Sequence, residues 1–207
     1  MIETALTLLR DELISFIESK NNTAISGDDV VLDNIGFFEA SKETDPLDNK
    51  IIITLVNIEE ESTLKNQPVL KRPFTNNAIY QNPPVHLNLY VLFTCTYAGN
   101  KYKDSALVAL SYIIGFVQSK NSFSIATSVS QIKDADMVQE DILNLKFSLE
   151  LYTLTFEQIN HLWGSLGGRQ MPFAMYKLRM VAITEKAILR EVPLIEEIEI
   201  DMNNTPL

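Results

Sequence analysis

Hydrophobic residues recur at steps of three and four in three parts of the chain, which is the period of an α-helix. The first stripe lies within residues 2–17, the second within residues 103–120 and the third within residues 155–166. Thr155 stands at the start of the third, and Gln158 is placed to complete a capping box. The three stripes are formed by Ile2, Leu6, Leu9, Leu13, Phe16 and Ile17; by Ala106, Leu107, Leu110, Ile113, Ile114 and Val117; and by Phe156, Ile159, Leu162, Trp163 and Leu166.

Alternation at a step of two predicts strands over residues 85–96, 145–153 and 173–184. Residues 51–58 (IIITLVNI) are rich in β-branched side chains and apolar on both faces, which indicates a central strand covered on each side. Residues 30–32 are expected to form a short strand. In the last long strand, alternation places Ala174, Tyr176, Leu178, Met180 and Ala182 on one face, and Phe173, Met175, Lys177, Arg179, Val181 and Ile183 on the other.

The order of these elements predicts an α+β fold, with a mixed, largely antiparallel sheet packed by two or three helices. We expect one domain over residues 1–190, with polar excursions near residues 59–84 and 121–141. The first excursion contains Pro68, Pro73, Pro83 and Pro84, and we expect an extended arm or a poorly ordered loop there.

Residues 191–207 form a tail whose first part carries five acids and no base. Period two persists in this tail, and Pro193 would confine such a strand to the edge of a sheet. The alternating apolar positions are Val192, Leu194, Ile198 and Ile200.

The composition excludes some classes of function. A chain of 207 residues with 46% hydrophobic residues can bury a core, and its net charge of −10 argues against binding through nucleic-acid phosphates or to an anionic membrane. Such a charge serves solubility alone, or it provides an acidic face for a basic partner. No apolar run reaches the length of a membrane span, and Glu3, Arg10 and Asp11 interrupt the apolar pattern at the start, unlike a signal peptide. We therefore expect a cytoplasmic protein.

The residues that usually carry chemistry are isolated. His86 and His161 lack a second histidine or a carboxylate at metal-ligand spacing, and His161 lies across its helix from the Trp163 stripe, so it should face solvent or a partner. Cys95 is the only cysteine and lies on the apolar face of a strand, which indicates a buried structural thiol. We predict no catalytic site, no metal and no cofactor.

Two short runs resemble functional motifs but are better explained by structure. Residues 164–168 (GSLGG) lie at the end of a predicted helix, whereas phosphate loops precede helices, so this run indicates a helix stop. The run of three glutamates at residues 59–61 could chelate a cation, but a solvated charge run is the simpler interpretation.

Lys177 and Arg179 are the least ordinary residues, because two cations share one strand face between the apolar Met175 and Val181. One interpretation is a cross-strand pairing with Glu150, if the two strands are neighbours. The other is an intersubunit contact with carboxylates of another protein. The pattern leaves both open. Trp163 is most simply a core aromatic residue.

Four segments, in this order and spacing, resemble one known family. They are residues 83–94 (PPVHLNLYVLFT), the helical residues 107–117, residues 162–168 (LWGSLGG) and residues 171–181, which run from Met-Pro into a strand with alternating cations. Together they resemble the tail-terminator, or tube-cap, proteins of extracellular contractile injection systems, such as the anti-feeding prophage and the Photorhabdus virulence cassettes. The resemblance covers roughly residues 1–185.

This resemblance implies a non-enzymatic assembly protein with a phage tail-terminator-like fold. Its relatives form hexameric rings on the distal end of the inner tube and the sheath and stop their polymerisation, so the partners would be further copies of the chain and the tube and sheath proteins. The protein would be cytoplasmic during assembly and then part of the injection particle. The candidate interaction residues are Lys177, Arg179, His161, Val192, Leu194, Ile198 and Ile200.

Two other functions remain open at this point. One is a baseplate or adaptor component of a similar particle, and the other is a small-ligand binding domain. A stable ring, or a ring formed only on tube ends, would distinguish the terminator from both.

Overall fold

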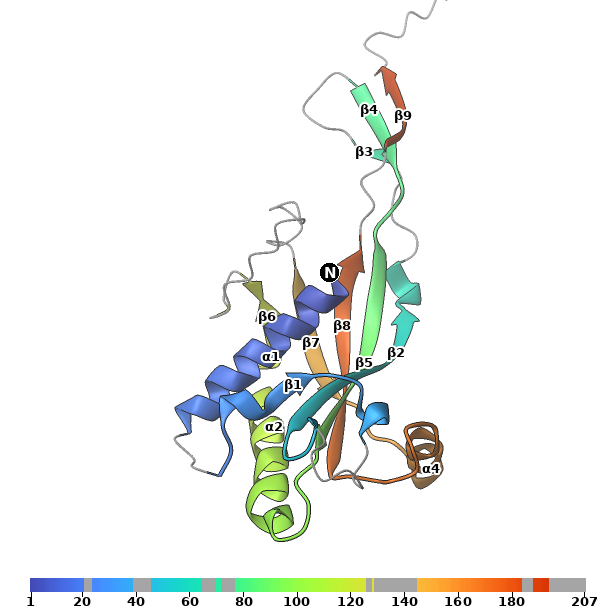
Figure 1. Cartoon of the computed structure of the whole chain (residues 1–207). Helices are drawn as coiled ribbons and strands as arrows, with labels where there is room; N and C mark the ends of the chain where they lie inside the picture. The colour runs from blue at the N-terminus through green and yellow to red at the C-terminus, as the bar shows by residue number, and fades with distance from the viewer. Residues whose placement is uncertain are drawn as a thin grey trace, which may run out of the picture.

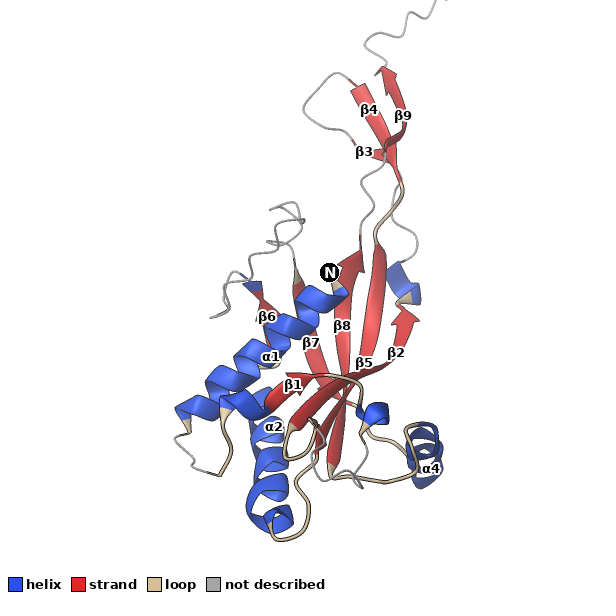
Figure 2. Cartoon of the chain, viewed as in Figure 1, coloured by secondary structure: helices blue, strands red, loops and turns tan. Residues whose placement is uncertain are grey.

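The computed structural model confirms the predicted α+β fold (Figures 1 and 2). Its described residues contain the α-helices α1 (Ile2–Ser19), α2 (Leu107–Ser119) and α4 (Phe156–Ser165). Short turns are η1 (Gly27–Asp29), η2 (Ile35–Phe37), η3 (Ser62–Leu64) and the π-helical turn η4 (Tyr102–Ala106), which leads into α2. The structure describes residues 1–20, 24–38, 46–64, 70–71, 77–125, 128, 145–183 and 188–193.

A six-stranded sheet forms the centre of the molecule. Its strand order is β1-β2-β5-β8-β7-β6, in which β1 is parallel to β2 and every other neighbouring pair is antiparallel. The sheet is thus mixed and largely antiparallel, as predicted. Its strands are β1 (Val30–Leu32), β2 (Ile51–Glu60), β5 (Val85–Cys95), β6 (Ser122–Ser124), β7 (Lys146–Leu151) and β8 (Phe173–Ile183).

A second, three-stranded sheet extends from one end of the first and forms an arm (Figure 1). Its order is β3 (Leu70–Lys71), β4 (Asn77–Gln81) and β9 (Ile188–Pro193). The arm continues the central strand pair, because β4 precedes β5, β9 follows β8, and both pairs are antiparallel. Pro83 and Pro84 lie at the junction, where their missing amide hydrogens interrupt the ladder.

The two faces of the six-stranded sheet are covered differently (Figure 1). Helices α1 and α2 pack on one face and form the larger core with alternate residues of the strands. Helix α4 and turn η2 pack on the other face, where Trp163 is buried together with Ile52, Leu92 and Met175. The prediction that Trp163 is a core aromatic residue is confirmed.

The predicted face assignments are wrong at the end of β8, for Val181, Ala182 and Ile183. Leu89 of β5 lies opposite Leu178 of β8, but Leu87 lies opposite Val181, so β8 contains one extra residue in this interval. Such a β-bulge changes which residues share a face. Val181 consequently lies with Leu178 in the α1 and α2 core and is fully buried, rather than on the face of Lys177.

The predicted ends of α4 are confirmed. The Thr155 hydroxyl accepts a hydrogen bond from the Gln158 amide, and the Gln158 side chain accepts one from the Thr155 amide. At the other end, Gly167 and Gly168 have φ angles of 105° and 80°, which favour glycine, and the Gly168 amide donates to the Trp163 carbonyl. The GSLGG run is therefore a helix stop.

A single threonine marks the point where β1 separates from β2. The Thr54 hydroxyl donates to the Asp33 carbonyl and accepts from the Ile35 amide, at 2.7 and 3.1 Å. These two hydrogen bonds take the place of the backbone hydrogen bonds that would continue the pairing of β1 with β2. The chain then turns into η2, which packs on the α4 face. The edge of the sheet is thus shared between two elements, β1 at one end and β2 at the other.

Replacing Thr54 by valine should therefore destabilise the fold. Thr54→Val keeps the shape of the side chain but leaves a buried amide without its acceptor, and we expect the free energy of unfolding to fall by about 1–3 kcal/mol. Urea denaturation measures the change. Thr94→Val is the matched control, because Thr94 is fully buried in the same sheet and its hydroxyl has no partner among the described residues. Equal losses in the two variants would show that the Thr54 hydrogen bonds do not matter.

Candidate functional site

The face of the sheet that carries α4 changes character along its length. Near α4 its strands contribute apolar and aromatic residues to the smaller core. Further toward the arm, the same strands contribute charged and polar residues that no described helix covers. We call this second set the charged patch; it consists of Glu59, Glu61, Asn88, Tyr90, Glu150, Lys177 and Arg179.

Lys177 pairs with β2 across the intervening strand β5. Its Nζ lies 3.3 Å from Oε2 of Glu59, and the same oxygen accepts a hydrogen bond of 2.6 Å from the Tyr90 hydroxyl. The Lys177 ammonium also lies 5.3 Å from the centre of the Tyr90 ring, a distance that permits a cation–π interaction. Three neighbouring strands are thereby linked through one lysine and one tyrosine.

Arg179 links the strands on both of its sides. Its Nη1 lies 3.3 Å from Oε1 of Glu150 on β7, and its Nη2 lies 3.4 Å from Oε2 of Glu61, which follows β2. Glu61 also accepts hydrogen bonds from the Asn88 amide group at 2.9 Å and the Thr63 hydroxyl at 2.8 Å. The patch therefore spans four strands.

Two carboxylates of this patch, Glu59 and Glu61, are held in their ionised form. Hydrogen bonds from Asn88 and Thr63 lower the pKa of Glu61 to about 2. Hydrogen bonds from Tyr90 and Lys177 likewise lower the pKa of Glu59. A general acid must keep its proton near neutral pH, and an effective base needs a higher pKa than these groups have. The arrangement suits a fixed surface of paired charges rather than proton transfer.

The structure shows that the predicted cations have partners within the chain. The cross-strand pairing with Glu150, one of the two interpretations of the sequence, is present through Arg179. A contact of Lys177 or Arg179 with another subunit remains a prediction.

The other predicted interaction residues lie elsewhere on the molecule. His161 is 80% exposed on α4, as the helical period predicts, with its Nε2 4.0 Å from Glu157. Val192 lies in β9, while Leu194, Ile198 and Ile200 lie outside the described residues.

The sequence interpretation missed the role of Glu59 and Glu61. The glutamate run was interpreted as a solvated charge run at the start of an excursion, whereas β2 continues to Glu60 beside β5 and brings Glu59 and Glu61 within reach of the cations on β8. Their cationic partners, Lys177 and Arg179, are 118 residues away along the chain. The available signal was the matching number of charges. Lys177 and Arg179 place two cations on one face of their strand, and Glu59 and Glu61 place two acids on one face of theirs.

Other groups with possible chemistry are inert in this structure. Cys95 is buried, and burial raises the pKa of its thiol to about 12, so it is not a nucleophile at neutral pH. Within the described residues, no group of three histidine, cysteine or acidic side chains could hold a metal ion. No helix in that part of the chain is long and apolar enough to cross a membrane.

The ionised Glu61 should make stability depend on pH. Its pKa is about 2 in the folded protein and about 4.5 in the unfolded chain, so the unfolded state binds the extra proton between these values. Its stabilising contribution is complete above pH 4.5 and is lost as the pH falls toward 2. Urea denaturation at pH 7 and pH 3 should show Glu61→Gln less stable than the original at pH 7, with a smaller difference at pH 3. A difference that does not change with pH would contradict this assignment.

Comparison with known proteins places the fold. The model of the Pvc16 N-terminal domain family matches residues 4–197. A solved structure of the sheath/tube terminator of an extracellular contractile injection system, PVC, is similar with a TM-score of 0.59 and 12% identity, and the match covers 97% of this chain and 64% of that one. The cap of the anti-feeding prophage, a tube-terminating cap, is similar with a TM-score of 0.50 and 14% identity over 73% of this chain and 49% of that one.

These two solved chains are longer than the present one, which spans about two thirds of the first and half of the second. No curated protein sequence matches this chain. The family model, in contrast, covers nearly the whole chain, from α1 to the segment that follows β9. The chain therefore belongs to the Pvc16 N-terminal domain family.

Proposed function

We propose that this protein is a tail terminator that forms a hexameric ring on the distal end of the tube and sheath of a contractile injection system. The ring ends polymerisation because one of its faces complements the last layer and the other offers no site for a further layer. The observation that carries the proposal is the similarity over 97% of this chain to a protein that terminates both sheath and tube. Family membership supports it independently.

The architecture supports an assembly role. The arm extends the β5–β8 pair beyond the body and so provides a contact surface away from the core (Figure 1). Assembly of identical subunits into a closed ring needs two different complementary surfaces on each subunit. The charged patch on the α4 face of the sheet and the arm that extends from its end are two such surfaces and could serve in these contacts.

The role we propose is non-enzymatic. The charged groups of the patch are engaged with one another, and the carboxylates Glu59 and Glu61 have lowered pKa values. The two similar solved structures are described as a terminator and a terminating cap. The protein would act in the cytoplasm while the particle assembles and would then remain part of it.

Particle length tests the proposal. Particles produced without this protein should have a broad length distribution and ends that continue to grow, because nothing stops the addition of tube and sheath subunits. Electron microscopy of negatively stained particles measures both properties. Restoring the protein should restore a narrow distribution. Particles of normal, uniform length in its absence would contradict the terminator role, and missing baseplates would favour a baseplate component instead.

A charge exchange tests whether Lys177 contacts a partner. Glu59→Lys combined with Lys177→Glu keeps an ion pair inside the chain but reverses the charges that a neighbour would meet. We expect this variant to fold with a near-normal thermal midpoint and to terminate few particles. The single variant Lys177→Glu, which places two carboxylates together, should have the lower thermal midpoint.

Normal termination by the exchanged variant would show that the pair serves only the fold. The exchanged variant leaves the net charge of the chain unchanged, so a general electrostatic effect cannot explain a difference. The Glu150–Arg179 pair does not offer the same experiment, because Arg179 also contacts Glu61 and a glutamate at position 179 would meet that carboxylate.

A further inference from the structure

Three residues of the predicted apolar stripes lie at the surface of the chain. Leu107 and Ile114 of α2 are 40% and 48% exposed, and Phe156, the first residue of α4, is 88% exposed. The other residues of these two stripes pack in the larger or the smaller core. Large apolar side chains that a helix presents to solvent are typical of a surface covered by a partner.

Helix α2 is uncharged along its whole length. Residues 107–119 contain no aspartate, glutamate, lysine or arginine, although only one side of the helix is buried. Its outer side carries Leu107, Ser111, Ile114 and Gln118, all exposed, and the Ser111 hydroxyl donates to the Leu107 carbonyl. A helix that faces water normally carries charges on that side. The composition of α2 is thus that of a helix covered on both sides.

Two neighbouring residues extend the apolar surface of α2. Tyr102, in the turn that leads into α2, is 49% exposed, and Leu151 at the end of β7 is 61% exposed. Leu151 lies on the same face of the sheet as α2, because it pairs with Tyr176, which belongs to the α1 and α2 core. We call Tyr102, Leu107, Ile114 and Leu151 the α2 surface.

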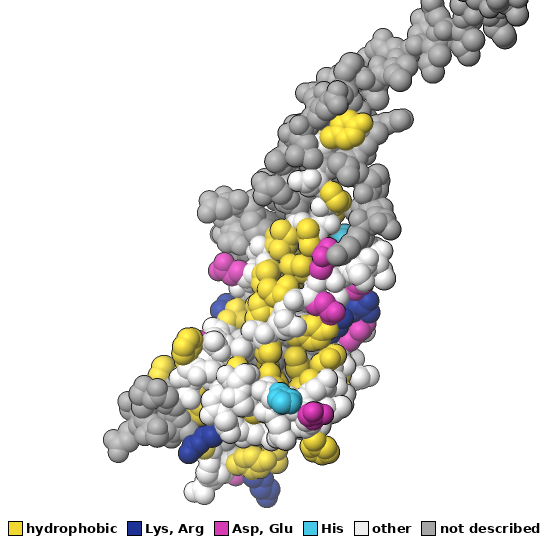
Figure 3. Space-filling view, turned by 90° about the vertical axis from the view of Figure 1, so that its right-hand side faces the viewer, with side chains coloured by type: hydrophobic (Ala, Val, Ile, Leu, Met, Phe, Trp, Pro, Cys, Tyr) yellow, Lys and Arg dark blue, Asp and Glu magenta, His cyan; other side chains and the backbone are white. Residues whose placement is uncertain are grey.

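A second exposed apolar surface lies on the opposite face of the sheet. Phe156 begins α4, and Phe37 of η2 is 74% exposed. Turn η2 and helix α4 share the smaller core, where Ile35 and Leu166 pack. Figure 3 looks onto the α4 side of the body and shows hydrophobic side chains at its surface at the end away from the arm. We call Phe37 and Phe156 the α4 surface; exposed aromatic residues of this kind are enriched in protein interfaces.

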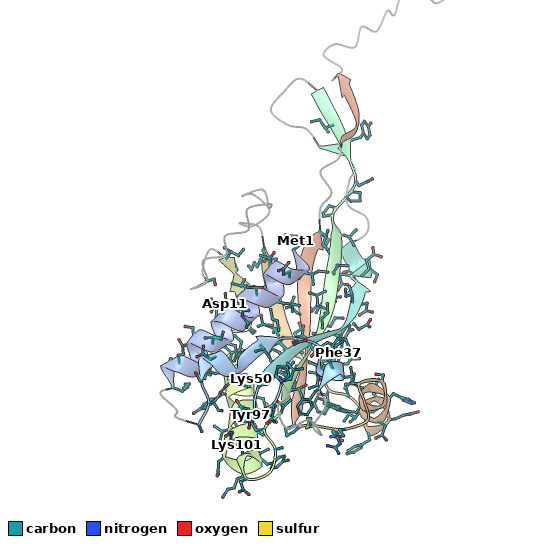
Figure 4. The ribbon with its side chains drawn as sticks, viewed as in Figure 1. Met1, Asp11, Phe37, Lys50, Tyr97 and Lys101 are labelled. Atoms are coloured by element: carbon teal, nitrogen blue, oxygen red, sulfur yellow. The ribbon has the colours of Figure 1, made fainter. Side chains whose placement is uncertain are left out.

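Both surfaces lie at the end of the sheet away from the arm. Helix α2 follows β5 and helix α4 precedes β8, and the end of β5 pairs with the start of β8 through Thr94 and Phe173. The arm continues from the other ends of the same two strands (Figure 1). Figure 4 shows Phe37 on the α4 side of the body and Lys101 near α2. Each chain therefore has one apolar surface on each side, as head-to-tail contact between identical subunits requires.

The charges beside the two surfaces differ in sign. Lys101 and Lys103 lie just before α2 with a single acid, Asp104, and all three residues are exposed. Glu157 lies in the first turn of α4, a helix without lysine or arginine. Its carboxylate is 4.0 Å from Nε2 of His161, which is charged only when protonated. In a chain with a net charge of −10, the local excess of lysine beside α2 favours an acidic partner.

We propose that the α2 surface of one copy of this chain docks on the α4 surface of the next copy, head to tail. The exposed phenylalanines of one copy pack against Leu107 and Ile114 of the other, and Glu157 lies near the lysines that precede α2. That such contacts close into a ring of six rests on the proposed function; the contact between two copies does not. Because the contact is at the end away from the arm, the arm stays free to reach the tube or sheath.

Other occupants of the α2 surface fit less well. A tube or sheath subunit on α2 would cover one apolar surface and leave the phenylalanines of the other exposed. A symmetric pair, in which two α2 surfaces meet, would leave them exposed as well. Head-to-tail contact between copies covers both surfaces with one kind of interface.

Mixing two variants tests the contact directly. Ile114→Gln removes the apolar side chain from the α2 surface, and Phe156→Gln removes the ring from the α4 surface. Both positions are exposed, so the thermal midpoints should change little. In sedimentation velocity, the original chain should form oligomers as its concentration rises, and each variant alone should associate at least about tenfold more weakly. An equimolar mixture should form pairs but no larger oligomers, because each variant keeps the surface that the other lacks.

A charge reversal tests the orientation of the contact. Glu157→Lys should weaken association about two- to fivefold, because it places a third cation beside the lysines that precede α2. Its matched control is Glu3→Lys, since both acids lie in the first turn of a helix. Glu3 is near Met1, which Figure 4 shows toward the arm. The control should associate as the original does.

The proposal is overturned if the original chain stays monomeric up to about 1 mM, the range of the weakest specific contacts. It is also overturned if the mixture forms no pairs, or if Glu157→Lys and Glu3→Lys weaken association equally. Loss of association in only one of the two glutamine variants would indicate a symmetric pair and would overturn it as well.

Particle length separates this proposal from the terminator role. Particles made with Ile114→Gln or Phe156→Gln should have the broad length distribution of particles without the protein. If both variants terminate particles normally, the contact is wrong and the terminator role stands. If the original is monomeric and both variants fail to terminate, the two surfaces bind tube or sheath and the proposal is overturned. Uniform length without the protein contradicts the terminator role alone, since pairing in the mixture still supports the contact.

Discussion

The antiparallel pairing of β5 with β8 is the contact on which the rest of the structure depends. These are the longest strands of the sheet, with 11 residues each, and they lie at its centre. Strand β2 attaches to β5 and strand β7 to β8, so the pair sets the register of both outer parts. The same two chain segments continue past Pro83 and Pro84 as β4 and β9. One strand pair therefore positions the core, the charged patch and the arm.

The surface that results from this pairing carries paired charges. On the α4 face, Lys177 and Arg179 are engaged by three carboxylates, Glu59 and Glu61 at the end of β2 and Glu150 on β7, which leaves paired charges rather than a reactive site. The cations stand on β8 and the carboxylates on its two sides, so the same strand pair that orders the sheet also sets the geometry of this surface.

Local patterns predicted the elements well, and contacts between distant segments were the part they missed. Thr155, Gln158 and the glycines at 167 and 168 gave both ends of α4 because capping uses neighbouring residues. The buried position of Trp163 followed from helical period. Val181 was assigned to the wrong face because a bulge depends on pairing with β5. Glu59 and Glu61 were missed for the same reason, since their cationic partners lie 118 residues away.

The position of the protein in the assembled particle tests the central claim most directly. Cryo-electron microscopy of intact particles, at a resolution that separates α-helices from sheets, would show where this fold lies. The account predicts a sixfold ring at the end opposite the baseplate, in contact with the last layer of tube or sheath, with each subunit fitted by the α1, α2 and six-stranded sheet arrangement. Density for the fold only at the baseplate, or along the whole length of the tube, would contradict it.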